Sequence, residues 1–383
     1  MVKAANLNNE QIIIRRKLLS NIANNYYERG TYLPSIRQLA ESYQVNPARV
    51  YRVINDLCRS DVLAARHGQG VLVKNPAKAI ELLETVGSKT IAFTMPDWIR
   101  RGKSNPHFSE VLRGAEEVAS LRGYHIIYAT VHLECDVKSE QTSESEEQLS
   151  SPQSRFFHEK EIEGILLVGP IPEHQVRKFV SAHPVPTVCV DNAPEMKDVT
   201  CVTSSNFYGA MHATDYLISR GHHQIGYITA NREQLCVDER LMGFRASMYK
   251  HHIENEIAFV KEMDFSQDTF EGGYEFAKEL ICSGMIEKAS AILTTNDNVS
   301  AGLLKGLVDR GVKVPEDVSI MGFGNDPMGL ACQPALTTME VQSYRMGKIA
   351  MEILLDIVVM GKSPGELIML PMRVIERDSV KDC

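Results

Sequence analysis

Long apolar runs are absent from this 383-residue sequence, and no stretch reaches the roughly 18 residues that a membrane-spanning helix needs. The eight cysteines are scattered and form no Cys-x-x-Cys pair, so the sequence indicates neither a zinc site nor a disulfide framework. Free thiols are typical of a reducing cytoplasm. The first residues are polar and lack the apolar segment of a signal peptide, so we expect a cytoplasmic protein without membrane contact, metal or cofactor.

Sequence motifs of common enzymes are also missing. The chain contains no Gly-x-Ser-x-Gly nucleophile turn, no phosphate-binding Gly-x-x-x-x-Gly-Lys loop and no His-x-x-x-His metal pair. We therefore expect a protein that is not an enzyme.

Charge is distributed unevenly along the chain, whose net charge is −8. Residues 1–88 carry 12 of the 41 lysines and arginines but only 7 of the 49 acidic residues, which leaves 29 basic against 42 acidic residues in the remainder. A basic N-terminal segment followed by an acidic remainder is consistent with an N-terminal segment that contacts nucleic-acid phosphates. An imbalance of this size also arises by chance.

The basic segment has the pattern of three helices and a hairpin. Apolar spacing predicts helices over 9–29, 35–42 and 46–60 and strands over 62–66 and 70–73. Ser35 and Asn46 are residue types that cap helices, and Pro47 suits the first helical position because its missing N–H costs nothing there. This order of elements predicts a winged helix-turn-helix in residues 1–75, followed by a linker in 76–88.

From Lys89 onward, apolar runs of strand length alternate with amphipathic helices. Continuous apolar strands between helices indicate parallel sheets that are covered on both faces. The 295 residues from 89 to 383 are more than a single hydrophobic core usually holds, so the sequence predicts two α/β lobes. We place lobe one at about 89–220 and 338–362, and lobe two at about 221–337 and 363–383. The chain then crosses between the lobes near Gly221, near 337–341 and near 361–366.

The basic segment resembles the GntR family of winged-helix repressors over about 65 residues. The resemblance rests on Leu33-Pro34-Ser35-x-Arg37-x-Leu39-Ala40, Val45-Asn46-Pro47-Ala48-Arg49-Val50-Tyr51-Arg52 and Arg66-His67-Gly68-Gln69-Gly70. It implies that a recognition helix enters the major groove of double-stranded operator DNA. The family often has Arg-Thr-Thr in place of Pro47-Ala48-Arg49, so its base preference does not carry over.

The resemblance also assigns DNA contacts to individual residues. Arg49 and Arg52 lie on one helix face next to Tyr51, and an arginine can bind guanine with two hydrogen bonds. The remaining expected contacts are Arg37 on the preceding helix and Arg66, His67, Gly68 and Gly70 at the wing. For the arginines the alternative is an ordinary solvated surface. Val53, Ile54 and Leu57 are expected in the core.

The larger segment resembles the effector domain of the LacI family, which has a periplasmic-binding-protein fold. The quoted stretches include Asn105-Pro106-His107-Phe108-Ser109-Glu110, Glu239-Arg240-Leu241-Met242-Gly243-Phe244 and Thr294-Thr295-Asn296-Asp297. A GntR-type reader joined to such a domain is similar to AraR-type regulators. Ligands of open α/β sheets bind beyond the carboxyl ends of the strands. The expected effector contacts are Trp98, Phe108, Arg240, Asn296 and Asn325.

Each of these effector contacts has a structural alternative. Trp98 and Phe108 could stack on a sugar or pack ordinarily, and Arg240 could bind ligand hydroxyls or form a salt bridge. Asp297 is expected to cap the following helix. Where the LacI family usually has an Asp after Gly322-Phe323, this chain has Gly324-Asn325-Asp326. Either Asn325 or Asp326 takes that role, or the ligand specificity differs from that of the family.

Together these features predict a transcriptional regulator, a repressor, that binds operator DNA as a homodimer. A small polar effector, a sugar, would enter between the lobes and shift the equilibrium between lobe arrangements. The alternative is a regulator whose lobes bind a protein partner and no metabolite.

Overall fold

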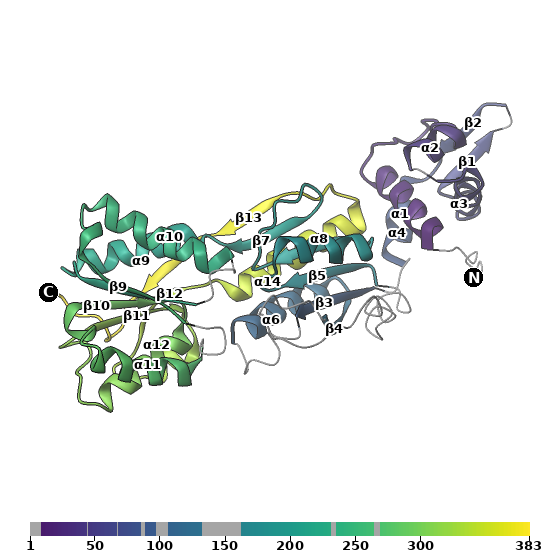
Figure 1. Cartoon of the computed structure of the whole chain (residues 1–383). Helices are drawn as coiled ribbons and strands as arrows, with labels where there is room; N and C mark the ends of the chain where they lie inside the picture. Colours follow the sequence, from purple (N-terminus) through teal and green to yellow (C-terminus); the bar gives the residue numbers. More distant parts are fainter. Residues whose placement is uncertain are drawn as a thin grey trace, which may run out of the picture.

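The computed structural model describes residues 9–43, 45–66, 68–85, 89–96, 106–131, 162–230, 235–263 and 269–383. Figure 1 shows a small N-terminal unit beside an elongated body built around two sheets. The expected fold class, an N-terminal winged helix with α/β lobes, is confirmed. Within the described ranges, no helix combines the length and the apolar character that crossing a membrane requires.

The N-terminal unit, called the reader below, is a winged helix followed by one further helix. It comprises α1 (Asn9–Ala23), α2 (Ile36–Ser42), α3 (Pro47–Arg59), the antiparallel strands β1 (Leu63–Arg66) and β2 (Gly70–Val73), and α4 (Pro76–Thr85), which packs against α1. Both expected caps are present, since Ser35 Oγ accepts from the N–H of Gln38 at 3.3 Å and Asn46 Oδ1 from that of Ala48 at 2.9 Å.

The first helix is shorter than predicted. It ends at Ala23 and does not reach residue 29. Asn25 adopts a φ of 57°, which is the left-handed region and cannot continue a right-handed helix. The side chains of Leu18, Leu19 and Ile22 are fully buried in the core of the reader.

Lobe one is organised around a six-stranded sheet of order β13-β7-β6-β5-β3-β4, in which all neighbours are parallel. Its strands are β3 (Thr90–Pro96), β4 (His125–Val131), β5 (Gly164–Val168), β6 (Thr187–Val190), β7 (Thr200–Ser204) and β13 (Leu367–Leu370), and its helices are α6 (Pro106–Leu121), α8 (Glu173–Ala182) and α14 (Ser343–Met360).

The two faces of this sheet are covered by different helices. Side chains alternate along each strand, so Leu166 and Val188 share one cluster with residues of α6 and α14. Ile165 and Cys189 face the other side and pack with Val176 and other residues of α8. This double cover explains why β5 and β6 are buried throughout and almost entirely apolar.

Lobe two repeats this arrangement around the sheet β14-β12-β11-β10-β8-β9, in which only β14 runs antiparallel to its neighbour. Its strands are β8 (Ile225–Thr229), β9 (Ile257–Glu262), β10 (Ala291–Thr294), β11 (Ser319–Gly324), β12 (Thr337–Glu340) and β14 (Arg373–Ile375). Its helices include α9 (Asn206–Ser219), α10 (Leu235–Lys250), α11 (Phe270–Cys282), α12 (Asp297–Val308) and α13 (Pro327–Ala331).

The chain crosses between the lobes at positions that differ in part from those expected. The first crossing lies between β7 and α9, near Ser205 and not near Gly221, because α9 packs against α10 of lobe two. The second lies between β12 and α14, close to the expected 337–341. The third lies between β13 and β14, not at 361–366, because β13 pairs with β7 in lobe one.

Candidate functional site

The DNA-facing surface of the reader is set by the amphipathic character of α3. Val53 and Leu57 are fully buried and Ile54 is nearly so, as expected for core positions. Tyr51 lies on the opposite face with 55% of its surface exposed, and Arg52 beside it is also exposed. A helix with a packed face and an exposed Tyr-Arg pair has the form of a recognition helix.

Two further basic residues meet next to this helix. Arg37 from α2 and Arg49 from the first turn of α3 line the same open hollow, together with the cap residue Asn46. The Asn46 cap positions this turn, since its side chain accepts from the N–H of Ala48. Guanidinium groups in a hollow at a helix N-terminus can bind phosphate oxygens or base edges.

The wing is the hairpin β1–β2. Gly68 and Gly70 have φ values of 74° and 107°, which only glycine adopts readily, and Arg66 is exposed on β1. The hydroxyl of Tyr32 donates to Gln69 Oε1 at 2.9 Å and steadies the tip. His67, an expected contact, lies outside the described residues.

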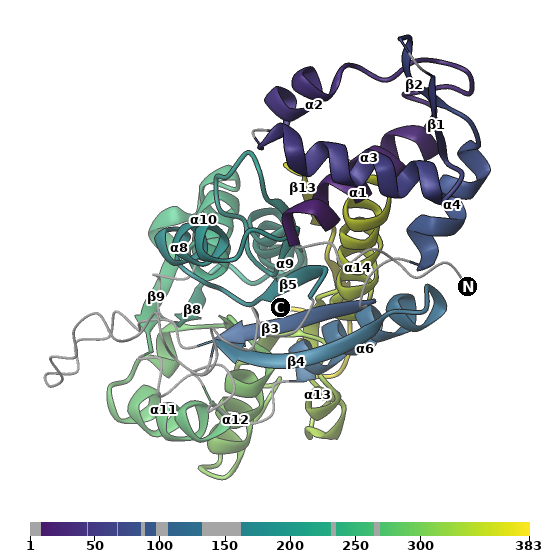
Figure 2. The ribbon, with the colours of Figure 1, turned by 90° about the vertical axis from the view of Figure 1, so that its right-hand side faces the viewer.

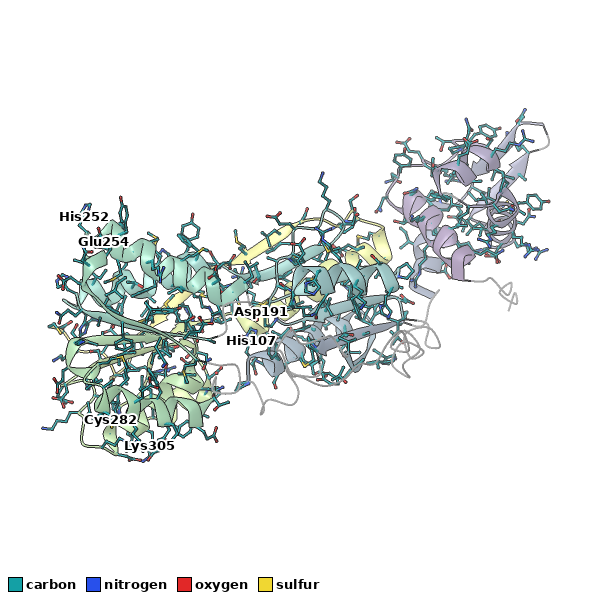
Figure 3. The ribbon with its side chains drawn as sticks, viewed as in Figure 1. His107, Asp191, His252, Glu254, Cys282 and Lys305 are labelled. Carbon is teal, nitrogen blue, oxygen red and sulfur yellow. The ribbon has the colours of Figure 1, made fainter. Side chains whose placement is uncertain are left out.

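Between the lobes, three polar residues distant in sequence form one cluster on the lobe-one side. His107 Nδ1 lies 2.6 Å from Ser343 Oγ, and His107 Nε2 lies 3.1 Å from Asp191 Oδ2. His107 is the second residue of α6, Asp191 follows the carboxyl end of β6, and Ser343 begins α14. Figure 3 shows His107 and Asp191 at the boundary between the lobes. This is where ligands of open α/β sheets bind.

Sequence reasoning did not select these three residues as contacts. The rule that site residues follow strand ends could have identified Asp191, which comes directly after β6. No local signal joins residues 107, 191 and 343.

On the lobe-two side, Arg240 is a half-buried residue with fixed partners. Its Nε donates to Asn206 Oδ1 at 3.0 Å and its Nη1 to the carbonyl of Thr295 at 2.7 Å. Its guanidinium carbon lies 4.8 Å from the ring centre of Phe323. These contacts orient the guanidinium at the carboxyl ends of β10 and β11, where the neighbouring Thr295 follows β10.

Electrostatic interactions connect the two sides. Burial is the main cause of the raised pKa of Glu239, and the carboxylate of Asp191 in the other lobe adds to it. Burial likewise raises the pKa of Asp326, while His107 of lobe one lowers it. The lobes therefore present acidic and basic groups to one another where they meet.

The roles of Asn296 and Asp297 differ from the expected ones. Asn296, and not Asp297, caps α12, because its Oδ1 accepts from the N–H of Val299 at 2.9 Å. Asp297 is fully buried and accepts from the hydroxyl of Thr338 at 2.6 Å and from the N–H of Asp326 at 2.8 Å. Asn296 remains half-exposed at the carboxyl end of β10.

The remaining expected effector contacts are Asn325, Phe108 and Trp98. Asn325 Oδ1 accepts from Arg377 at 2.5 Å and its Nδ2 donates to Glu340 at 3.2 Å, so both ends of its amide hold lobe two together. Phe108 packs partly against the lobe-one core. Trp98 lies outside the described residues. In the part of the chain that the structure describes, no group of three His, Cys, Asp or Glu side chains could hold a metal ion.

Two family models match separate parts of the chain. Residues 13–73 match the model of the bacterial regulatory proteins of the gntR family, and residues 214–380 match that of the periplasmic binding protein-like domain.

Two curated relatives match most of the chain. The HTH-type transcriptional regulator RegA of Clostridium saccharobutylicum is 25% identical over 90% of this chain and 98% of its own length. The ribose operon repressor of Escherichia coli (strain K12) is 24% identical over 91% of this chain and 100% of its own. Among solved structures, a LacI family transcriptional regulator from Enterococcus faecium with bound ribose has a TM-score of 0.62 and 23% identity, and covers 77% of this chain and 99% of that one.

Proposed function

Because this chain joins a GntR-type helix-turn-helix domain to a periplasmic-binding-protein-like domain, we propose that it is a transcriptional repressor controlled by a small polar effector. The observation that carries the proposal is that one chain contains both a DNA-binding type of domain and a ligand-binding type of domain. An exposed Tyr51-Arg52 pair lies on a helix with the form of a recognition helix, and polar side chains of two α/β lobes gather where the lobes meet.

The reader binds double-stranded operator DNA in this proposal. Arg49, Tyr51 and Arg52 contact base edges or nearby phosphates from α3, Arg37 contacts the backbone from α2, and Arg66 with the wing glycines contacts the flanking groove. A homodimer would place two readers on the half-sites of a pseudo-palindrome. A regulator that acts on chromosomal DNA works in the cytoplasm, and relatives that are regulators support a function without catalysis.

The effector binds between the lobes, and a sugar fits the groups present. Arg240 supplies a fork of donors, Asn296 supplies both a donor and an acceptor, and the carboxylate of Asp191, which His107 holds in place, supplies a further acceptor for hydroxyl groups. Ribose is bound in the similar Enterococcus faecium structure. This supports a sugar over the alternative of a protein partner in the cleft.

A thermal-shift screen of pentoses, hexoses and sugar acids on the full chain tests the effector. A ligand at 100 times its dissociation constant stabilises the folded state by about 2.7 kcal/mol. Each sugar that raises the melting temperature is then added to a gel-shift assay with operator DNA selected from a random pool. A chain that binds no duplex at low salt, with or without these sugars, contradicts the proposal.

A further inference from the structure

The first helix of the reader contacts the end of a lobe-one helix. Met360 is the last residue of α14, and its carbonyl is one of the four that have no partner within the helix. The hydroxyl of Ser20 on α1 donates to this carbonyl, and Asn24 Nδ2 donates to it at 2.7 Å. Two side chains of the reader thus cap the carboxyl end of α14. Figure 2 shows α1 next to this end of α14.

An ion pair forms a second contact between the same two parts. Arg16 on α1 lies 2.6 Å from the carboxylate of Glu163, whose side chain is only 4% exposed. The carboxylate also accepts from the backbone N–H of Lys89 at 2.9 Å and from the hydroxyl of Tyr124 at 3.2 Å. Glu163 is therefore held by lobe one and is aimed at the reader. A nearly buried carboxylate that loses its cationic partner is costly.

Helix α14 itself is fixed firmly to lobe one. Gly347 packs against the carbonyl of Val111 and Gly114 against that of Tyr344, and neither position has room for a β-carbon. The opposite end of α14 carries Ser343, which hydrogen-bonds His107 where the lobes meet, directly after the crossing from lobe two. One helix of 18 residues thus extends from the cleft to the reader.

We propose that Arg16, Ser20 and Asn24, together with Glu163 and the carbonyl of Met360, form a joint that holds the reader and lobe one as one rigid body. The inference rests on the proposed function for its purpose. When an effector changes the angle between the lobes, the reader moves together with lobe one and α14. It does not move independently on a flexible linker. In a dimer, this motion resets the spacing of the two readers on DNA.

The hydrogen-bonding groups on the two sides of the joint are complementary. Its lobe-one side offers one carboxylate and one helix-terminal carbonyl, both of which are acceptors. The reader supplies only donors, namely a guanidinium and a hydroxyl from α1 and the amide of Asn24 just after it. Gly361 completes the fit, since a β-carbon there would lie 2.8 Å from Ser20 Oγ.

Single-molecule energy transfer between the reader and lobe one tests the joint in the full chain. Dyes are attached through unnatural amino acids at the exposed positions Arg59 and Ser120, because the eight native cysteines rule out thiol labelling. The wild-type chain is expected to show one narrow distance distribution. The variant Arg16→Gln/Ser20→Ala/Asn24→Ala should broaden it by about twofold or more, because the connecting chain then holds the reader alone.

The matched control is Lys17→Gln, which removes one positive charge from the same helix. Lys17 is exposed and lies over the ring of Tyr43 within the reader, so the distribution should stay as narrow as in the wild type. Thermal melting checks that each variant is folded, and Arg16→Gln alone replaces the triple variant if that one does not fold. A broad distribution in the wild type, or an unchanged width in the variants, overturns the proposal.

The measurement needs neither DNA nor effector. A failure of the joint therefore shows in the distance distribution, whereas a failure of the proposed function shows in the gel shift. The two outcomes are independent of one another.

Discussion

Thr338 donates a hydrogen bond of 2.6 Å to the carboxyl group of Asp297, and this bond joins the start of α12 to β12 inside lobe two. Burial raises the pKa of Asp297 to about 7. The hydroxyl of Thr338 and the N–H of Asp326 oppose the rise because they stabilise the charged form. The carboxyl end of β10 near Asn296 thus depends on a carboxyl group that titrates close to neutrality.

Asp297 should make the stability of the chain depend on pH. In unfolded chain its pKa returns to 3.8, so between about pH 4 and pH 7 the folded state keeps a proton that the unfolded state has released. Its contribution is fully present below the unfolded pKa and is lost as the pH rises through about 7, at up to about 1.4 kcal/mol per pH unit. Urea unfolding of wild type and Asp297→Asn at about pH 5 and pH 7 measures this. Parallel pH profiles for the two proteins would contradict it.

Arg49→Ala is expected to relax sequence preference on DNA. Loss of a guanidinium that contacts a base edge should weaken binding to the selected operator by about 1–3 kcal/mol and leave binding to random duplex less affected. Fluorescence anisotropy with both duplexes at the same salt concentration measures the ratio. Arg59→Ala is the control, since Arg59 is exposed in the last turn of the same helix. Equal losses on both duplexes would assign Arg49 to phosphate contact.

Arg240→Lys should weaken binding of the sugar that the thermal-shift screen selects by about tenfold or more. Lysine keeps the charge but not the planar fork that holds Asn206 and Thr295 and can meet a ligand at the same time. Titration calorimetry gives the dissociation constant. Arg245→Lys serves as the matched control, because Arg245 is exposed on the same helix. An unchanged affinity for Arg240→Lys would limit that residue to a structural role.

Asp56→Ala should destabilise the reader by about 3–5 kcal/mol, because it leaves a buried arginine without its partner. The carboxylate of Asp56 lies 2.6 Å from Arg15 Nε, and both side chains are at most 10% exposed. Calorimetry of the full chain would record a lower melting transition for the reader. Asp61→Asn removes the charge of an exposed pair with Lys74 and should leave that transition unchanged, because asparagine tolerates the left-handed backbone of residue 61, whose φ is 63°. The prediction fails if both variants melt like the wild type.

Local features of the sequence determined most of the elements. Ser35 and Asn46 cap helices through bonds to residues two or three positions away, so their residue types were sufficient to predict them. Apolar runs determined β5 and β6 because both faces of their sheet are covered. The sequence did not predict β7, β13 or β14. Strands β13 and β14 are short and partly exposed, so they resemble the loops around them, whereas β7 is buried but has polar residues at three of its five positions.

Tertiary structure alone decided the arrangements that depend on distant residues. Asn296 and Asp297 are adjacent residues of types that both cap helices, and only the position of Thr338 leaves the cap to Asn296. The cluster of His107, Asp191 and Ser343 and the contact of Ser20 with Met360 join segments separated by 84 to 340 positions. Such pairs leave no periodic signal in a single chain, because the folded sheets, not the spacing along the sequence, bring them together.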